Sequence, residues 1–324
     1  MIITRTPFRA SFAGGGSDVR WFYQENGYGE VLSAALKHYM YIVIHPYFHS
    51  KRFRLKYSQT EDISNIDEIQ HSIMRSCLQR FQMVGGIEIS SFADVPAGTG
   101  LGSSSSFTVG LLHALYAWHG KEVTKAQLAK EACEIEIEVL GKPIGKQDQY
   151  AAAFGGVRRY RFNNDETVEV ESINLSKEIV NKLENNLCLY HVSGTRSADS
   201  ILKKQNSMDN RFNKAEHIRN LVDMVKPLKE DLKMGRLDAI GSSLHKGWIT
   251  KKSIVSDISG SEIDKYYDKA RNLGALGGKL LGAGGAGFLM LYCHNHQKLK
   301  KNLGLKPLAF EIDNEGTKLL YFDK

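Results

Sequence analysis

Apolar and polar positions in the N-terminal part of the chain follow a pattern typical of β-strands. Residues 2–13 alternate, and the segment EVLSAALKHYMYIVIHPYF at 30–48 is rich in tyrosine, valine and isoleucine, which predicts paired strands. The segment GGIEISSFADV at 85–95 continues the pattern and leads directly into a run of glycine and serine. This part of the chain is therefore predicted to be rich in strands.

Helical spacing begins directly after the glycine and serine run. Apolar residues recur on one helix face at Phe107, Leu111, Leu115 and Trp118. A second helix is predicted over residues 124–140, where Thr124 and Gln127 match a capping box ahead of an apolar stripe. The strands are thus followed by two consecutive helices.

The character of the sequence changes near residue 180. Polar, helix-forming sequence dominates from about residue 176 to 272, followed by GALGGKLLGAGGAGFLMLY and a terminal strand, KLLYFD. Strands and helices are mixed without regular βαβ alternation, which predicts an α+β fold. We expect two domains, residues 1–180 and 181–324.

The composition is that of a globular chain, with 324 residues of which 42% are hydrophobic and 24% are charged. The net charge of +7 is spread along the chain, which disfavours nucleic acid as a partner and is compatible with a small phosphorylated ligand. No stretch is typical of a secretory signal or a membrane span, so no membrane partner is expected. Four scattered cysteines predict free thiols in the cytoplasm.

The stretch PAGTGLGSSSSF, residues 96–107, could be a flexible linker or a loop that binds an anion. A strand enters it and an amphipathic helix leaves it, which argues against a linker. Gly98, Gly100 and Gly102 allow sharp turns and a close approach of the backbone to a ligand. The serines fall at a helix N-terminus, where free N–H groups attract phosphate. The pattern therefore favours a phosphate-binding loop, although no lysine follows the last glycine as in a Walker A loop.

Two further glycine clusters accompany this loop. GAGGAG at 282–287 matches GxGxxG, but it follows a helix and precedes a strand, the reverse of the order in dinucleotide-binding folds. Close packing of backbone against a ligand or a neighbouring loop explains it better. FAGGGSD at 12–18 joins a strand to a helix expected near Asp18, where Ser17 or Asp18 could be an N-cap. Three such turns suggest one shared site.

Two acidic residues stand out by position. Glu136 falls beside the apolar stripe of its helix, so its carboxylate needs a partner, either a divalent cation or a buried arginine. Asp148, in GKQDQYAAAFGG, is either a helix N-cap or a base that orients or deprotonates a hydroxyl nucleophile for phosphoryl transfer. Spacing alone leaves both pairs of alternatives open.

The chain resembles the kinase superfamily named for galactokinase, homoserine kinase, mevalonate kinase and phosphomevalonate kinase. TPFRASFAGGGSD resembles the first motif of that superfamily, PAGTGLGSSSS its phosphate loop and KLLGAGGAGF its third motif, in this order. The resemblance implies a two-domain α+β fold with ATP and substrate in the cleft between the domains. Among its members the chain is most similar to the kinases of D-glycero-D-manno-heptose 7-phosphate.

The resemblance also implies roles for residues at matching positions. Asp148 corresponds to the catalytic aspartate, Arg9 to the arginine that pairs with it, and Ser104 and Glu136 to the ligands of Mg²⁺. Asp18 resembles the aspartate that binds sugar hydroxyls, with Ser17, Gly284 and Gly285 also assigned to the substrate site. The predicted ATP-binding residues are Pro96, Gly98, Gly100, Leu101, Gly102, Ser103, Ser104 and Ser105.

A sugar phosphate also needs cations at the end that does not react. Arg196 is the first candidate, because its planar guanidinium suits phosphate. His245, Lys251 and Lys252 lie close together on a predicted helix with Trp248, which is itself expected in the core. The expected activity is ATP-dependent phosphorylation of the anomeric hydroxyl of a heptose 7-phosphate. The alternatives are a kinase of an unphosphorylated hexose such as fucose and a non-catalytic nucleotide-binding regulator, and a homodimer is compatible with the sequence.

Overall fold

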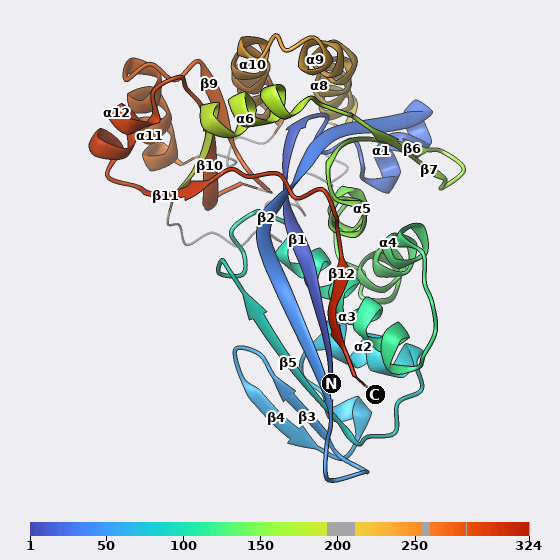
Figure 1. Ribbon diagram of the computed structural model, residues 1–324. Coiled ribbons are helices and arrows are strands. Elements are labelled where there is room, and N and C mark those ends of the chain that lie inside the picture. Colours follow the sequence, from blue (N-terminus) through green and yellow to red (C-terminus); the bar gives the residue numbers. More distant parts are fainter. Residues whose placement is uncertain (193–210, 255–259, 283, 324) are drawn as a thin grey trace.

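Two β-sheets organise the protein in the computed structural model, which describes residues 1–192, 211–254, 260–282 and 284–323 (Figure 1). The first sheet has the strand order β12-β1-β2-β5-β3-β4, with β6 and β7 continuing from β2. Its strands are β1 (Ile2–Ala13), β2 (Tyr28–Pro46), β3 (Phe53–Lys56), β4 (Thr60–Ile63), β5 (Ile87–Ala93), β6 (Val157–Asn163), β7 (Val168–Ser172) and β12 (Lys318–Phe322). The second sheet has the order β11-β8-β10-β9, formed by β8 (Leu187–Val192), β9 (Gly277–Leu280), β10 (Gly287–Tyr292) and β11 (Lys306–Ala309).

The segment that predicts paired strands forms one long strand, β2. It contains no glycine or proline between Gly29 and Pro46 that would turn the chain, so it runs on past the point where pairing changes. Its first half pairs with β6 and its second half with β5. The register with β1 shifts between Pro7 and Phe8, and this irregularity lets one strand serve both halves of the sheet.

Helices cover one face of the first sheet (Figure 1). α3 (Ser103–Trp118) and α5 (Gln147–Phe154) pack directly on β1 and β2, while α2 (Ser72–Arg80) and α4 (Lys125–Cys133) pack against α3 and α5. The contact with β1 is close: Thr4 Oγ1 donates to Gly110 O at 3.0 Å, and a Cβ at Gly110 would lie 2.7 Å from Thr6 Oγ1. The predicted apolar face of α3 is confirmed, since Phe107, Leu111 and Leu115 are buried.

The remaining helices gather around the second sheet and the upper end of the first (Figure 1). They are α1 (Arg20–Asn26), α6 (Lys177–Asn186), α8 (Arg211–Asp223), α9 (Val225–Lys233), α10 (Asp238–Ile254), α11 (Ser261–Asn272) and α12 (His296–Leu303). α10 packs on both β9 and β1, so it links the two sheets. Its Trp248 is fully buried, as the sequence predicts. Among the described residues, no helix has both the length and the apolar character needed to span a membrane.

The C-terminal strand returns to the first sheet. β12 pairs antiparallel with β1, and the Met1 ammonium donates to Asp323 O at 2.5 Å, so the two ends of the chain lie side by side (Figure 1). The strand predicted from KLLYFD is therefore confirmed. The division into residues 1–180 and 181–324 stays a prediction; in space, the last strand extends the sheet that the first residues begin.

Candidate active site

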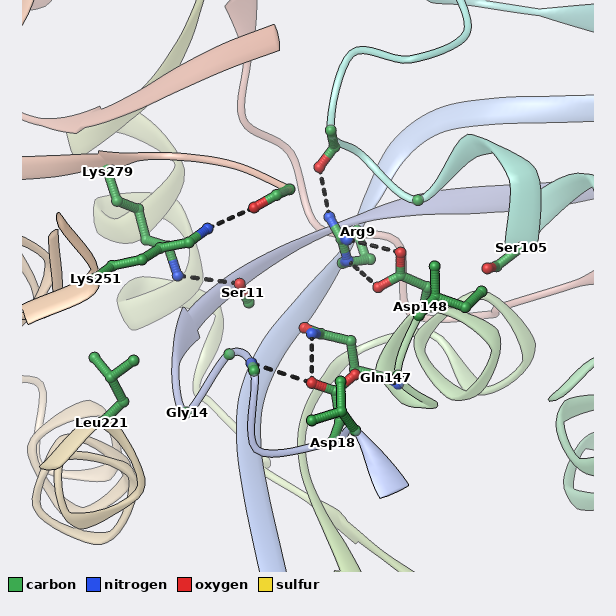
Figure 2. A pocket seen from close by; sticks show the side chains of 18 of the residues that line it. Arg9, Ser11, Gly14, Asp18, Ser105, Gln147, Asp148, Leu221, Lys251 and Lys279 are labelled. Carbon is green, nitrogen blue, oxygen red and sulfur yellow. Dashed lines mark hydrogen bonds and ion pairs between the residues drawn. The ribbon is translucent and has the colours of Figure 1, made fainter. Parts of the chain in front are cut away.

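A cavity of about 320 Å³ lies where the two sheets meet (Figure 2). The first sheet and its helices contribute the end of β1, the glycine loop after it, the start of α3 and the start of α5. α8, α10, β9 and the loop after β9 close the other side. Segments distant in sequence therefore converge on one pocket, as the three glycine-rich turns suggest.

The glycine and serine run forms a turn that ends at the N-terminus of α3. Gly98, Gly100 and Gly102 all have φ near +78°, a conformation that side-chain-bearing residues rarely adopt. Gly102 is the N-cap of α3, and Ser103 and Ser104 begin its first turn facing the cavity. The first N–H groups of a helix have no partner within it, so this end of the cavity is suited to an anion.

Arg9 and Asp148 form an ion pair beside this loop (Figure 2). Arg9 Nε donates to Asp148 Oδ1 at 2.6 Å and Nη2 donates to Oδ2 at 2.7 Å, while Nη1 donates to Gly100 O at 2.7 Å. A Cβ at Gly102 would lie 3.1 Å from Asp148 Oδ2, so the carboxylate rests against the loop backbone. Asp148 stands in the first turn of α5 after the N-cap Lys146, which rules out the N-cap interpretation.

The third glycine cluster packs directly against the loop. A Cβ at Gly100 would lie 2.4 Å from Leu281 O, and one at Gly282 would lie 2.5 Å from the Gly100 Cα. A Cβ at Gly287 would lie 2.4 Å from Thr99 O. The prediction that this cluster serves close backbone packing against a neighbouring loop is confirmed, because no side chain fits between the two segments.

Asp18 is buried in the cavity wall and does not cap a helix. α1 begins at Arg20 with Val19 as its N-cap, whereas the Asp18 carboxylate accepts from Gly16 N, Gln147 N and Gln147 Nε2 at 3.0–3.1 Å. Burial, with a smaller contribution from the Asp148 carboxylate, raises the pKa of Asp18 above its ordinary value. The cavity is thus lined by two aspartates in different environments, the buried Asp18 and the partly exposed Asp148.

Glu136 is fully buried because its helix changes register. The helix predicted over 124–140 becomes a π-helical segment at Glu134–Val139, which turns Glu136 toward α3. The carboxylate accepts from Ser104 Oγ at 2.6 Å, Gln149 Nε2 at 2.8 Å and Lys142 Nζ at 3.2 Å. In the described structure its basic partner is therefore a lysine, not the buried arginine that the sequence left open.

Lys142 joins Ser104 and Glu136 through its ammonium group. Nζ donates to Ser104 Oγ at 2.7 Å as well as to Glu136, so a positive charge already stands between these two oxygens. A hydroxyl and a carboxylate are the ligands that a hard divalent cation takes, usually together with water or phosphate oxygens. No group of three or more acidic, histidine or cysteine side chains that could hold a metal occurs in the described part of the chain. A cation here would need oxygens from a ligand.

Several predicted site residues line the cavity together. They are Arg9, Asp18, Gly98, Gly100, Gly102, Ser103, Ser104, Ser105, Asp148 and Lys251. Glu136 contacts this set through Ser104. Leu101 contributes its backbone, since Arg9 N donates to Leu101 O at 3.0 Å while the Leu101 side chain is in the core.

Other predicted residues do not line the cavity. Ser17 is buried under the first glycine loop and donates to Gly14 O and Glu30 O. His245 bonds Tyr267 and Lys252 pairs with Asp264, both away from the cavity. Pro96, Gly284 and Gly285 also lie outside the lining. Arg196 falls outside the described residues.

The structure adds polar residues that sequence reasoning missed. Ser11, Lys142, Gln147 and Lys279 line the cavity, and Gln149 bonds Glu136. Lys279 gave a signal that could have been used: it is the one charged residue in the segment GALGGKLLGAGGAGF, where a lysine has no apolar role. Gln147 and Gln149 flank Asp148, but nothing in their spacing indicates their partners.

Comparison with known proteins assigns this fold and site to a family. The model of the GHMP kinase N-terminal domain matches residues 69–156, and that of the GHMP kinase C-terminal domain matches residues 224–301. The D-glycero-alpha-D-manno-heptose 7-phosphate kinase of Campylobacter jejuni is 31% identical to the chain, over 98% of both proteins.

Solved structures agree with this assignment. The structure of a D-glycero-D-manno-heptose 1-phosphate kinase from Bacteroides thetaiotaomicron matches with a TM-score of 0.81 and 25% identity over all of both chains. Lactococcus lactis galactokinase, solved with galactose, shares the fold with a TM-score of 0.76 at 16% identity, over 98% of this chain and 94% of the other. The chain belongs to the GHMP kinase family, and the predicted α+β fold of that family is confirmed. It is an ATP-dependent kinase.

Proposed function

We propose that the protein transfers the γ-phosphoryl group of ATP to the anomeric hydroxyl of D-glycero-D-manno-heptose 7-phosphate, giving the 1,7-bisphosphate and ADP. The relative from Campylobacter jejuni, which is similar over nearly its whole length, is named for this sugar phosphate. The observation that carries the proposal is the position of the Asp148 carboxylate, which rests against Gly102 of the phosphate loop within one cavity. A base beside a phosphoryl-binding loop is what transfer to a hydroxyl requires.

In the proposed reaction, Asp148 orients the anomeric hydroxyl and accepts its proton. The hydroxyl oxygen forms a bond to the γ-phosphorus while the bond from that phosphorus to the bridging oxygen breaks, and ADP leaves with the electron pair. The Asp148 side chain is 22% exposed, so a bound hydroxyl can reach it from the cavity. Its bidentate pairing with Arg9 fixes the direction in which the carboxylate points.

Arg9 and the loop supply positive potential where charge develops. The Arg9 guanidinium contacts both the Asp148 carboxylate and the Gly100 carbonyl, so it lies between the base and the loop. The N–H groups of the loop and of the first turn of α3 are assigned to the phosphates of ATP. The Arg9 guanidinium is held by contacts within the protein, and charges fixed in this way lower an activation barrier most.

Ser104 and Glu136 are assigned to Mg²⁺. Their oxygens lie 2.6 Å apart and already receive the Lys142 ammonium, so the place accepts positive charge. When bound, the ion would neutralise charge on the phosphates of ATP. Asp18 is assigned to hydroxyl groups of the sugar, because its buried carboxylate faces the same cavity. We place the enzyme in the cytoplasm, where ATP is available.

A substrate panel tests this proposal. ADP release is measured with heptose 7-phosphate, unphosphorylated heptose, fucose and galactose as acceptors, and the new phosphate is located by phosphorus NMR. We expect kcat/KM for heptose 7-phosphate to exceed that for the hexoses by about a hundredfold or more, because a site built for a polar group rejects analogues that lack it. Equal or better turnover of fucose would make the protein a hexose kinase, and ATP binding with no acceptor-dependent ADP release would make it a regulator.

A further inference from the structure

Lys279 is a buried lysine that faces the cavity from β9. Its side chain is almost fully enclosed, and Nζ donates to Ser11 Oγ at 3.1 Å (Figure 2). The next two residues along the chain, Leu280 and Leu281, have fully buried apolar side chains. No carboxylate lies within ion-pair distance of Lys279 among the described residues. The Lys279 ammonium is thus largely removed from water, and its hydrogen-bond partner among the described residues is the Ser11 hydroxyl.

Lys251 reaches the same side of the cavity from the last turn of α10. Its Nζ donates to Gly282 O at 2.5 Å, and in the part of the chain that the structure describes it too has no acidic partner. Burial, with contributions from neighbouring cations, lowers the pKa of both lysines. Both lysines line the same cavity, and the positive charge of Lys251 contributes to the lowered pKa of Lys279.

Two adjacent cations that lack an anion are costly in a folded protein. Burying an unpaired charge is unfavourable, and like charges placed together add to the cost. Each ammonium has three N–H donors, of which the described residues use one, so within the described structure the pair keeps four donors for a ligand. A phosphate group has the charge and the acceptor oxygens to use them. The other cations of the cavity differ, because Arg9 and Lys142 already have carboxylate partners.

The lysine pair lies across the cavity from the Arg9–Asp148 pair. Figure 2 shows Lys251 and Lys279 on one side of the cavity and the Arg9–Asp148 pair on the other, with Ser11 between them. An anion held by the lysines would therefore be separate from the phosphates of ATP, which are assigned to the loop of residues 96–107. An acceptor that spans the cavity would present its hydroxyl to Asp148 and its far end to the lysines.

We propose that Lys251, Lys279 and the Ser11 hydroxyl bind the phosphate group of the acceptor that is not transferred, which makes this face of the cavity the element that selects a phosphorylated sugar. The inference rests on the proposed function, because it assigns one end of that acceptor. It identifies Lys279, on the second sheet, as a specificity-determining residue.

Kinetics of Lys279→Met and Lys251→Met test the assignment. We expect each variant to raise KM for heptose 7-phosphate by about tenfold to a hundredfold, because a charge-assisted contact is lost, with smaller changes in kcat. The KM for ATP and the slow turnover of unphosphorylated heptose should stay unchanged. Lys246→Met is the matched control, since Lys246 is exposed on the same helix and does not line the cavity. An increase in KM for ATP, or an equal loss with both acceptors, would overturn the proposal.

Calorimetry supplies a readout without catalysis. Binding of heptose 7-phosphate is measured without nucleotide at about pH 8.5, in buffers of different ionisation enthalpy; we expect net proton uptake that is reduced in both variants, because the phosphate favours the charged lysines. Inorganic phosphate serves as a second probe. If the wild type binds phosphate through these lysines but does not phosphorylate heptose 7-phosphate, the subsite stands and the proposed function fails. If it phosphorylates heptose 7-phosphate and the variants bind as tightly as the wild type, the subsite fails alone.

Discussion

The two sides of the cavity satisfy their charges in opposite ways. On the side of the first sheet, Asp18 and Glu136 each accept three hydrogen bonds from donors within the protein, and Asp148 accepts two from the Arg9 guanidinium. On the side of the second sheet, Lys251 and Lys279 each donate one hydrogen bond to a neutral oxygen of the described residues. The carboxylates are held in position by donors of the protein, whereas the lysines keep donors for the phosphate group that we propose they bind.

We infer from this difference that the two sides of the cavity have different roles in the proposed reaction. Groups that must point accurately at reacting atoms benefit from fixed partners, because preorganised charges need no rearrangement during the reaction. A group that selects a ligand benefits from being an unpaired buried charge. Such a charge destabilises the free protein, and a ligand of opposite charge removes that destabilisation when it binds. The difference also predicts that substitutions on the two sides affect different quantities, kcat on the first and acceptor affinity and pH dependence on the second.

The largest expected effect is that of Asp148→Asn on the first side. The amide keeps the size of the side chain but cannot accept the hydroxyl proton, so kcat should fall by about a thousandfold or more. ATP binding, measured by calorimetry, should change little, because the loop contacts are backbone groups. Asp268→Asn, at an exposed acid on α11, is the control. An asparagine variant with wild-type turnover would remove Asp148 from the mechanism and with it the contrast between the two sides.

An effect of intermediate size is expected from Lys251, on the second side, in the pH dependence of the free energy of unfolding. Burial first, and then the Arg9 charge, lowers the pKa of Lys251 to about 8 from its ordinary 10.5, while Asp18 opposes the shift. Between these values the unfolded chain binds more protons than the folded protein, so the free energy of unfolding rises with pH across the window. Below it both states are charged and the cost of burial is present in full. Lys279 acts in the same direction.

Urea unfolding of the wild type and Lys251→Met measures this contribution. The variant should be more stable than the wild type at about pH 7, and the difference should shrink toward about pH 10, where the cost to the wild type disappears. Titrations common to both proteins cancel in the comparison. A difference that is independent of pH would mean that the partly buried Lys251 is not destabilising as a cation in the folded protein.

The smallest expected effect concerns Lys142, the cation that shares Ser104 and Glu136. If its ammonium stands in the place of the proposed metal, Lys142→Met should bind Mn²⁺ a few-fold more tightly in the presence of ADP, because a competing positive charge is removed. The electron paramagnetic resonance signal of free Mn²⁺ measures this directly. Lys130→Met, at an exposed lysine on α4, removes the same charge elsewhere. Weaker or unchanged binding in Lys142→Met would place the metal away from this pair of oxygens.

Much of the fold and part of the site could be predicted from local sequence. The strand β1, the apolar face of α3 and the terminal strand are properties of neighbouring residues, and each is confirmed, although burial alternates only over the first four residues of β1. The paired strands expected over 30–48 form one strand, because pairing depends on partners that local sequence does not reveal. The alternative that Ser17 or Asp18 caps a helix is excluded by a partner that local sequence does not reveal either: the carboxylate of Asp18 bonds Gln147, 129 positions away.

What the sequence by itself determined is the glycine and serine turn at the start of α3 and the family. Alternate glycines that permit positive φ, followed by serines at a helix start, act over a few residues and so remain visible in one dimension. Only the tertiary structure decided which charges are satisfied. Arg9 meets Asp148, Lys142 meets Glu136, and Lys279 meets no acid in the described structure. The packing of the two sheets determines these partners, because it brings distant segments within a few ångströms of each other. The electrostatic energy of a charge depends on the groups around it in space and not on its neighbours in the chain.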